Sequence, residues 1–182
     1  MILESRDRPR FVSAWKQGCA GSTINEEASI PLEVAFMAFW GAKSDKIALL
    51  RKVAFFDGLS AQQLNQVARL ADEVEVEARR TLARAGDTGR ELFIIVDGEA
   101  VVRPARGRAI RLGRGDFFGE MSLIDGAPRS ATVEAATAMR LLVVGQREFW
   151  QLLSTVPSIS RRIMAALAER LREANAAYSA NP

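Results

Sequence analysis

The chain alternates between polar and apolar residues in a series of short segments, and this pattern limits its possible folds more than any other feature. At 73–78 three glutamates alternate with Val74, Val76 and Ala78, as in a strand with one solvated face. Similar segments lie at 81–85, 91–96, 99–103, 109–112, 131–136 and 139–144. Glycines separate them, and Asp97-Gly98 is a two-residue hairpin signal. Seven or eight such strands predict an antiparallel jelly roll.

Helical periodicity flanks the strand region on both sides. The expected helices cover 45–56, 60–71, 147–154 and 158–178. Ser60 is suited to the N-cap of the second helix, and Gln63, three residues later, completes a capping box. Pro157 separates the last two helices, because proline disrupts a helix interior. The fold class is therefore α+β: an antiparallel jelly roll with N-terminal helices, a C-terminal hinge helix and a long helix.

The first 43 residues do not share this pattern. Residues 1–27 are polar, mixed in charge and without a period, which predicts a mobile arm. A short apolar helix is expected over 32–40, where Phe36, Phe39 and Trp40 are too apolar to remain in water. It can pack on the main domain or a dimer partner, or anchor the chain to a membrane or another protein. The predicted division is an N-terminal extension over 1–43, a domain over 44–178 and a tail over 179–182.

The composition removes several classes of function. The chain has no histidine and a single cysteine, Cys19, which excludes an intramolecular disulfide, a thiolate zinc cage and the usual Ser–His or Cys–His nucleophile pair. A reducing cytoplasm fits this composition best. The longest apolar run, Val34 to Trp40, is far shorter than the roughly 20 residues of a membrane span. The net charge of +3 neither requires nor excludes a nucleic-acid partner.

The segment 115–133 combines the residues of an anion site. A helix is expected over Glu120–Asp125, and its free N–H groups and dipole favour negative charge at its start. Gly119 and Gly126 allow backbone N–H groups to approach a phosphate closely. Arg129 then supplies a fixed countercharge. The alternative is a purely structural ion pair between this arginine and the first glutamate of the helix, with the glycines serving only as turns.

The stretch Phe118–Thr132 resembles, without a gap, the phosphate-binding cassette of the cyclic nucleotide-binding domain family. It is especially similar to the cassette of the regulatory subunits of cAMP-dependent protein kinase, and the chain also resembles the sensor domain of cAMP receptor protein-type regulators. The lead-in Leu50–Ser60, the turn Ala85–Asp87 and the strand Phe93–Glu99 are similar to the family as well. The resemblance covers about 45–178 and implies the jelly roll with its flanking helices.

The resemblance implies a role for each cassette residue. It assigns Arg129 to the cyclic phosphate and Glu120 to the ribose 2′-hydroxyl. A planar guanidinium suits two phosphate oxygens, and a carboxylate accepts a hydroxyl hydrogen bond while repelling nucleotides with more phosphates. The implied ligand-binding residues are Phe118, Gly119, Glu120, Met121, Ser122, Arg129, Ser130, Ala131 and Val133. Leu123 matches the family's relay leucine, and Leu171 and Tyr178 are candidates for a lid over the base.

One position departs from the family's pattern, and another affects the choice between cAMP and cGMP. Where the family commonly has a glycine between the first two strands, this chain has Arg79-Arg80, so that turn must differ or carry strain. Threonine after the cassette arginine is associated with cGMP in the family. Ser130 has the hydroxyl without the methyl group, and serine also occurs there in cAMP-binding relatives. We therefore expect cAMP as the ligand, with cGMP as the alternative.

The expected function is that of a cyclic nucleotide-binding regulatory module, without catalytic residues, metal or cofactor. Binding is expected to draw the cassette inward, move Leu123 and repack the helices at 147–178. The alternatives are a ligand-free interaction or dimerisation module of the same fold and a DNA-associated regulator that acts through a partner. A homodimer could form through the C-terminal helix or the apolar N-terminal helix. Direct sequence-specific DNA binding is not expected, because only four residues follow Tyr178.

Overall fold

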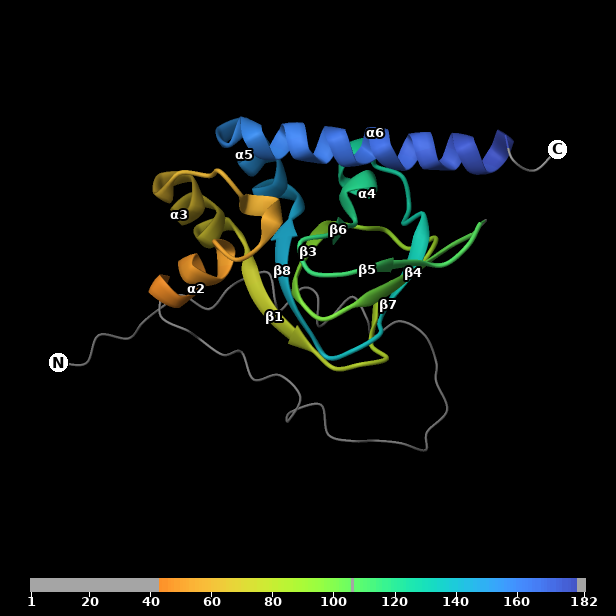
Figure 1. Cartoon of the computed structure of the whole chain (residues 1–182), viewed down its shortest axis with the longest axis horizontal. Coiled ribbons are helices and arrows are strands. Elements are labelled where there is room, and N and C mark those ends of the chain that lie inside the picture. Colours follow the sequence, from red (N-terminus) through yellow and green to blue (C-terminus); the bar gives the residue numbers. More distant parts are fainter. Residues whose placement is uncertain (1–42, 106, 180–182) are drawn as a thin grey trace. The chain divides into compact units, whose positions relative to one another are not determined.

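The computed structural model describes residues 43–105 and 107–179, which lie within one compact unit of the chain, Phe39–Pro182 (Figure 1). The predicted arm at 1–27 and the predicted apolar helix at 32–40 lie outside the described residues. The division of the chain after residue 43 therefore stays a prediction.

Two antiparallel sheets of four strands form the centre of the domain (Figure 1). The order of the first is β1 (Asp72–Val76), β8 (Met139–Gly145), β3 (Glu91–Asp97) and β6 (Phe117–Phe118). The order of the second is β2 (Thr81–Ala83), β7 (Ala131–Ala135), β4 (Ala100–Pro104) and β5 (Ile110–Leu112). The predicted antiparallel roll is confirmed, and each predicted strand is present with ends within two residues of those expected.

Strand β3 separates two hydrophobic cores, because successive side chains of a strand point to opposite faces. Leu92, Ile94 and Val96 belong to the cluster that β3 shares with the helices. Phe93, on the other face, stacks on Phe118 of β6 with 4.9 Å between the ring centroids. All of these side chains are buried. Strand β3 therefore reads as a continuous apolar run, as is typical of a strand covered on both faces.

The helical region before the roll contains two adjacent buried phenylalanines. Helix α2 (Lys43–Leu50) ends well before the 3-10 helix η1 (Ala54–Phe56), so the continuous helix expected over 45–56 is wrong. Phe55 and Phe56 are both buried, whereas an unbroken α-helix would point adjacent side chains about 100° apart. The chain leaves the path of α2 after Leu50, and both rings then lie in the core cluster.

Helix α3 (Ala61–Leu70) begins at the predicted cap. Ser60 Oγ accepts a hydrogen bond from the Gln63 N–H (3.2 Å), and Gln63 Oε1 accepts one from the Ser60 N–H (2.9 Å). The predicted capping box is confirmed, and it fixes the point at which the chain enters the helix. Leu64 and Val67 then pack in the cluster shared with β3.

Two helices follow the roll. Helices α5 (Gln146–Thr155) and α6 (Pro157–Ser179) are separated by Val156, and each end differs by one residue from the prediction. Pro157 is the first residue of α6, where its missing N–H leaves no helical hydrogen bond unmade. Ile159 and Ile163 of α6 are buried in the helix cluster. Figure 1 shows α6 running along one side of the roll.

The turn between β1 and β2 is strained at Arg79. Its φ of 67° lies in the left-handed region, which side chains other than glycine seldom adopt. The Arg79 N–H donates to Ala135 O (2.7 Å), and the Ala135 N–H donates to Arg80 O (2.9 Å). The sequence predicts a different or strained turn at this position, and the strain is confirmed.

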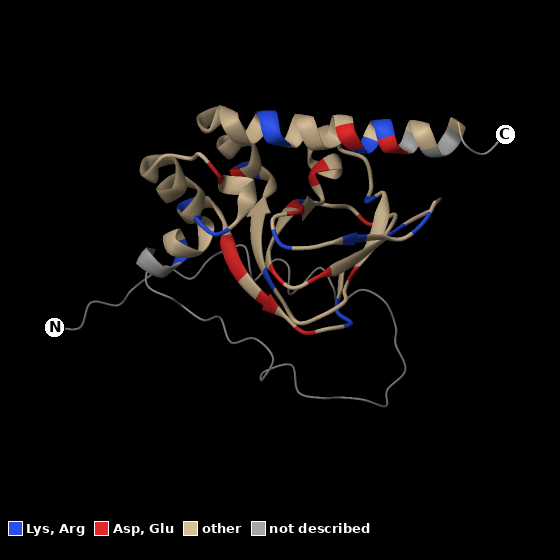
Figure 2. Ribbon diagram, viewed as in Figure 1, with Lys and Arg blue, Asp and Glu red and all other residues tan. Residues whose placement is uncertain are grey.

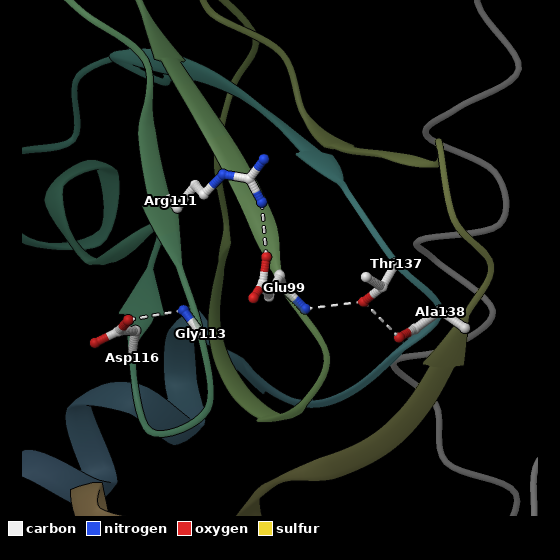
Figure 3. Close-up of polar contacts among 6 residues, drawn as sticks. All are labelled: Glu99, Arg111, Gly113, Asp116, Thr137 and Ala138. Carbon is white, nitrogen blue, oxygen red and sulfur yellow. Dashed lines mark hydrogen bonds and ion pairs between the residues drawn. The ribbon is translucent and has the colours of Figure 1, made fainter.

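The turns β3–β4 and β7–β8 meet closely at Gly98. Its φ is 87°, and a Cβ atom there would lie 2.5 Å from Ala138 O, so this position requires glycine. The next residue, Glu99, donates its N–H to Thr137 Oγ1 (3.0 Å), and its carboxylate accepts a bond from Arg111 Nη1 (2.8 Å) (Figure 3). These contacts join β5 to both turns and close this end of the roll.

Candidate functional site

A short helix between two left-handed glycines forms the centre of the candidate site. Gly119 follows β6 with a φ of 91°, and helix α4 (Glu120–Asp125) begins directly after it. Gly126 ends the helix with a φ of 70°. Both backbone conformations are favourable only for glycine among ordinary residues. The helix predicted over 120–125 is confirmed with its bounds, and it places Glu120 at its first position.

Arg129 lies buried beside the start of this helix, with its side chain 7% exposed. Its Nη1 donates to Gly119 O (2.9 Å), and its Nη2 donates to Glu91 Oε2 (3.0 Å). The guanidinium carbon lies 5.7 Å from the ring centroid of Phe93. The Arg129 backbone N–H donates to Asp87 O (2.8 Å), in the turn Ala85–Asp87 that resembles the family. A positive charge is therefore fixed at a defined position, as the binding of an anion requires.

Two glycines make room for the Arg129 guanidinium. A Cβ atom at Gly89 would lie 2.2 Å from Arg129 Nε, and one at Gly119 would lie 2.5 Å from Arg129 Nη1. Both distances are far below the roughly 3.5 Å of ordinary contact. Gly119 lies within the cassette motif and was predicted, whereas Gly89 and Glu91 lie outside the motif and were not. Glu91 lies 38 positions from Arg129 in the chain, so its role depends on the fold.

The carboxylate of Glu120 pairs with the C-terminal helix rather than with Arg129. The Glu120 side chain is 1% exposed, and its Oε1 accepts a bond from Arg170 Nη1 at 2.5 Å. Its Oε2 is buried and accepts no hydrogen bond within residues 43–105 and 107–179. Burial raises the pKa of Glu120 above its ordinary value of 4.5, although the charges of Arg170 and Arg129 act to lower it. One buried acceptor atom of Glu120 is thus left without a hydrogen bond among the described residues.

Arg170 is a site residue that the sequence analysis misses. Besides its bond to Glu120, it donates from Nη2 to Phe117 O (2.7 Å), and its guanidinium carbon lies 5.0 Å from the Phe117 ring centroid. In Figure 2 charged positions in the second half of α6 lie above α4, in line with this contact. Arg170 follows the buried Ile163 by seven residues, and this spacing places both on one face of a helix. That spacing is the signal that could have identified it.

The two predicted lid residues lie near the end of α6. Leu171 is 62% exposed, whereas the preceding Arg170 occupies the inward position. The side chain of Tyr178 lies outside the part of the chain that the structure describes. The assignment of a lid therefore stays a prediction for both residues.

The remaining predicted site residues divide by burial. Those with buried side chains are Phe118, Ser122, Leu123 and Val133. Ala131 is half-buried, and Met121 and Ser130 are exposed and joined by a weak bond from Ser130 Oγ to Met121 Sδ at 3.7 Å. Leu123 belongs to the cluster that also contains Ile159 of α6. The expected relay residue of the cassette therefore shares a hydrophobic cluster with the C-terminal helices.

The buried side chains of this site offer one cationic donor and one carboxylate acceptor. The Arg129 guanidinium, bonded to Gly119 O, is a donor suited to an anionic group, and the Glu120 carboxylate, on the next residue, is an acceptor suited to a hydroxyl. Among the described residues there is no group of three or more histidine, cysteine, aspartate or glutamate side chains that could hold a metal. None of the helices within residues 43–179 combines the length and apolar character that crossing a bilayer requires.

Known proteins share this cassette and its surroundings. Residues 73–156 match the family model of the cyclic nucleotide-binding domain. The chain is 38% identical over 122 residues to a cyclic nucleotide-gated potassium channel of Rhizobium etli, an alignment that covers 67% of this chain and 34% of the channel. It is 34% identical over 115 residues to a cAMP-dependent protein kinase regulatory subunit of Schizosaccharomyces pombe, covering 63% of this chain and 28% of that protein.

The fold is shared as well. The catabolite activator protein of Thermus thermophilus superposes with a TM-score of 0.62 and 28% identity, over 69% of this chain and 61% of that one. The chain spans about a third of the length of the two curated relatives, 34% and 28%. The family match, the relatives and the fold agree with the resemblance inferred from the cassette. Residues 73–156, which contain nearly all of the roll and the whole of α4, are thus a region of the cyclic nucleotide-binding domain family.

Proposed function

We propose that the domain binds a cyclic nucleotide, with cAMP preferred to cGMP, and that binding repositions its C-terminal helices. The observation that carries the proposal is the presence of a buried Arg129, bonded to Gly119 O, and a buried Glu120 on the residue that follows Gly119. The two curated relatives are a channel and a kinase regulatory subunit, which supports a regulatory role rather than an enzymatic one.

Arg129 would hold the cyclic phosphate. A cyclic phosphodiester carries one negative charge, and the planar guanidinium fork can donate to two of its oxygens. Arg129 has five N–H donors, of which two are used by Gly119 O and Glu91 Oε2. Glu91 keeps the buried guanidinium paired before a ligand arrives. The site can therefore hold a charge ready for the phosphate without leaving it unpaired.

Glu120 would hold the ribose. Its Oε1 is occupied by Arg170, whereas its buried Oε2 has no hydrogen-bond partner among the described residues. A 2′-hydroxyl that donates to Oε2 would satisfy this atom, and an unsatisfied buried acceptor costs about 1–3 kcal/mol. The carboxylate would also repel nucleotides that carry further negative charge near the ribose.

Arg170 and Leu123 would transmit binding to the helices. Arg170 contacts the ribose-binding carboxylate and the Phe117 carbonyl from α6. Leu123 packs in the same cluster as Ile159 of α6. A nucleotide that binds better when α6 is in contact with α4 shifts the population toward that arrangement. The movement of α6 is then a direct consequence of the difference in affinity between the two arrangements.

Calorimetric titration of the full chain with cAMP, cGMP and 2′-deoxy-cAMP tests the proposal. We expect saturable binding of cAMP, weaker binding of cGMP, and a loss of roughly ten- to a hundredfold in affinity for the 2′-deoxy ligand. 5′-AMP, which carries a further negative charge, is the control and should bind much more weakly. Failure of both cyclic nucleotides to bind would contradict the proposal.

The alternative functions give different results in the same set of assays. A ligand-free module would bind neither nucleotide but would still self-associate through α6 or the apolar N-terminal helix. A DNA-associated regulator would shift DNA in a gel only when its partner is added. For a binding module we expect cAMP to be recovered unchanged after incubation, as chromatography can measure. Homodimer formation and a cytoplasmic location remain parts of the proposal that need their own measurements.

A further inference from the structure

The first half of α6 and its second half are held to the domain in different ways. Ile159 and Ile163 are buried in the helix cluster, and Leu167 packs partly against it. Farther along, Leu171 is 62% exposed, and the helix is tied to α4 and β6 through the side chain of Arg170. The position of Arg170 therefore depends on how precisely the first half of the helix is fixed.

Arg162 fixes the first half of α6 to η1. Its Nη1 donates to Ala54 O at 2.6 Å, and its Nη2 donates to Asp57 O. Ala54 is the first residue of η1, and its carbonyl also accepts the Asp57 N–H (3.1 Å), whereas Asp57 directly follows η1. One guanidinium thus holds carbonyls from both ends of this short helix. Apolar packing can tolerate a small rotation or slide of a helix, whereas two charge-assisted bonds from one planar group define its position.

The 3-10 helix η1 in turn contacts residues of the candidate site. Phe55 of η1 packs against Phe117 with 5.0 Å between the ring centroids. Phe117 is the residue whose carbonyl and ring contact Arg170. Arg114, in the segment between β5 and β6, donates from Nη2 to Lys52 O (2.8 Å) just before η1. A closed set of contacts thus runs from α6 through Arg162 to η1, then to Phe117 and back to α6 through Arg170.

We infer that Arg162 is a positioning residue for the cyclic-nucleotide site, acting through Arg170. Eight residues separate the two arginines, or about 12 Å along the helix, so the bonds of Arg162 set where Arg170 meets Glu120. This inference rests on the proposed function in one respect, the use of Glu120 by a nucleotide. It adds that a residue bonded to Ala54 O and Asp57 O, at and just after η1, sets nucleotide affinity.

A double-mutant cycle tests the inference. We expect Arg162→Ala to weaken cAMP binding about three- to tenfold in calorimetry, because Arg170 then holds the Glu120 carboxylate less of the time. In an Arg170→Ala background the same change should have almost no further effect. Arg162→Lys, which keeps the charge but not the planar fork, should restore part of the affinity. Additive losses in the double mutant would overturn the inference, because a residue that stabilises the fold independently gives additivity.

Arg161→Ala is the matched control, since Arg161 is the exposed neighbour of Arg162 on the same helix. A second measurement needs no nucleotide and separates failure of this inference from failure of the proposed function. Hydrogen–deuterium exchange of the amides at 120–125 should be faster in Arg162→Ala and Arg170→Ala than in Arg161→Ala. Equal exchange in the Arg161 and Arg162 variants would overturn the positioning role whether or not the wild-type protein binds cAMP.

Discussion

At the scale of single residues, the site depends on how two buried charges are accommodated. Arg129 is paired with Glu91 and bonded to Gly119 O, while Glu120 is paired with Arg170. A charge taken out of water is tolerated only when a partner compensates for it. We therefore expect changes at these partners to affect binding far more than changes at exposed ion pairs such as Arg111–Glu99, whose side chains are 74% and 51% exposed.

Gly89 should be essential for binding although its backbone conformation is not unusual. A methyl group at Gly89 would lie 2.2 Å from Arg129 Nε, so Gly89→Ala must displace the guanidinium. We expect cAMP affinity to fall at least roughly tenfold in calorimetry, as the weakening of a charge-assisted bond implies. Gly113→Ala is the control, because nothing lies within 4 Å of a Cβ atom there. Equal affinities of the two variants would contradict this account of Arg129.

The buried Glu120 should make the stability of the ligand-free protein depend on pH. The pKa of Glu120 in the folded protein is raised above 4.5, chiefly by burial. Between pH 4.5 and this raised pKa, the native state therefore binds more protons than the unfolded state. The contribution of Glu120 to stability is thus fully present below pH 4.5 and is lost as the pH rises through the folded pKa. The slope cannot exceed about 1.4 kcal/mol per pH unit for one proton.

Urea unfolding of wild type and Glu120→Gln from pH 4 to pH 8 measures this effect. The free energy of unfolding of wild type minus that of the variant should decrease as the pH rises above 4.5. Other groups with shifted pKa values, such as Asp72, whose pKa burial also raises, cancel in the difference. A difference that is constant or increases over this range would show that Glu120 is not held at a raised pKa.

At the scale of secondary-structure elements, periodicity predicts most of the fold. The strands, the capping box at Ser60 and helix α4 follow from local patterns, because alternation and helical spacing depend on neighbours in the sequence. The break after Leu50 and the two-residue strand β6 were not predicted. Both are decided by tertiary packing: the rings of Phe55 and Phe117 lie 5.0 Å apart between their centroids although they are distant in the sequence.

The part of the site that lies within one local sequence motif could be predicted, and the part that depends on tertiary packing could not. Arg129, Glu120 and Gly119 lie within one continuous cassette, so the local motif identifies them. Glu91 and Arg170 come from β3 and α6, 38 and 50 positions from the residues they contact. No local pattern connects such distant residues, although the buried face of α6 could have suggested Arg170.

The strained turn between β1 and β2 allows a prediction about the stability of the fold. Arg79 has a φ of 67°, which costs an ordinary residue about 1–2 kcal/mol and glycine nothing. Glycine also loses more entropy on folding, so we expect Arg79→Gly to raise the free energy of unfolding by only about 0.5–1 kcal/mol. Arg79→Ala is the control, since it removes the guanidinium but keeps the strain. No gain for glycine relative to alanine in urea unfolding would contradict the assignment of strain.

At the scale of the whole molecule, the described residues connect a ligand site to two helical regions. Helix α6 contacts α4 through Arg170 and η1 through Arg162. In the proposed function, a nucleotide bound at Arg129 and Glu120 would change the balance of contacts that α6 makes with both. The chain spans 34% and 28% of two curated relatives that differ from each other in kind, a channel and a kinase regulatory subunit.

The central claim is that Arg129 binds the phosphate of a cyclic nucleotide, and calorimetric titration of wild type and Arg129→Ala with cAMP tests it most directly. Loss of a charge-assisted hydrogen bond of about 1.5–3 kcal/mol predicts a roughly ten- to a hundredfold weaker affinity for Arg129→Ala. Arg129→Lys, which retains the charge, should fall between the two, and Arg111→Ala should bind as wild type does. Thermal unfolding verifies that each variant is folded at the titration temperature. Unchanged cAMP affinity in a folded Arg129→Ala variant would contradict the account.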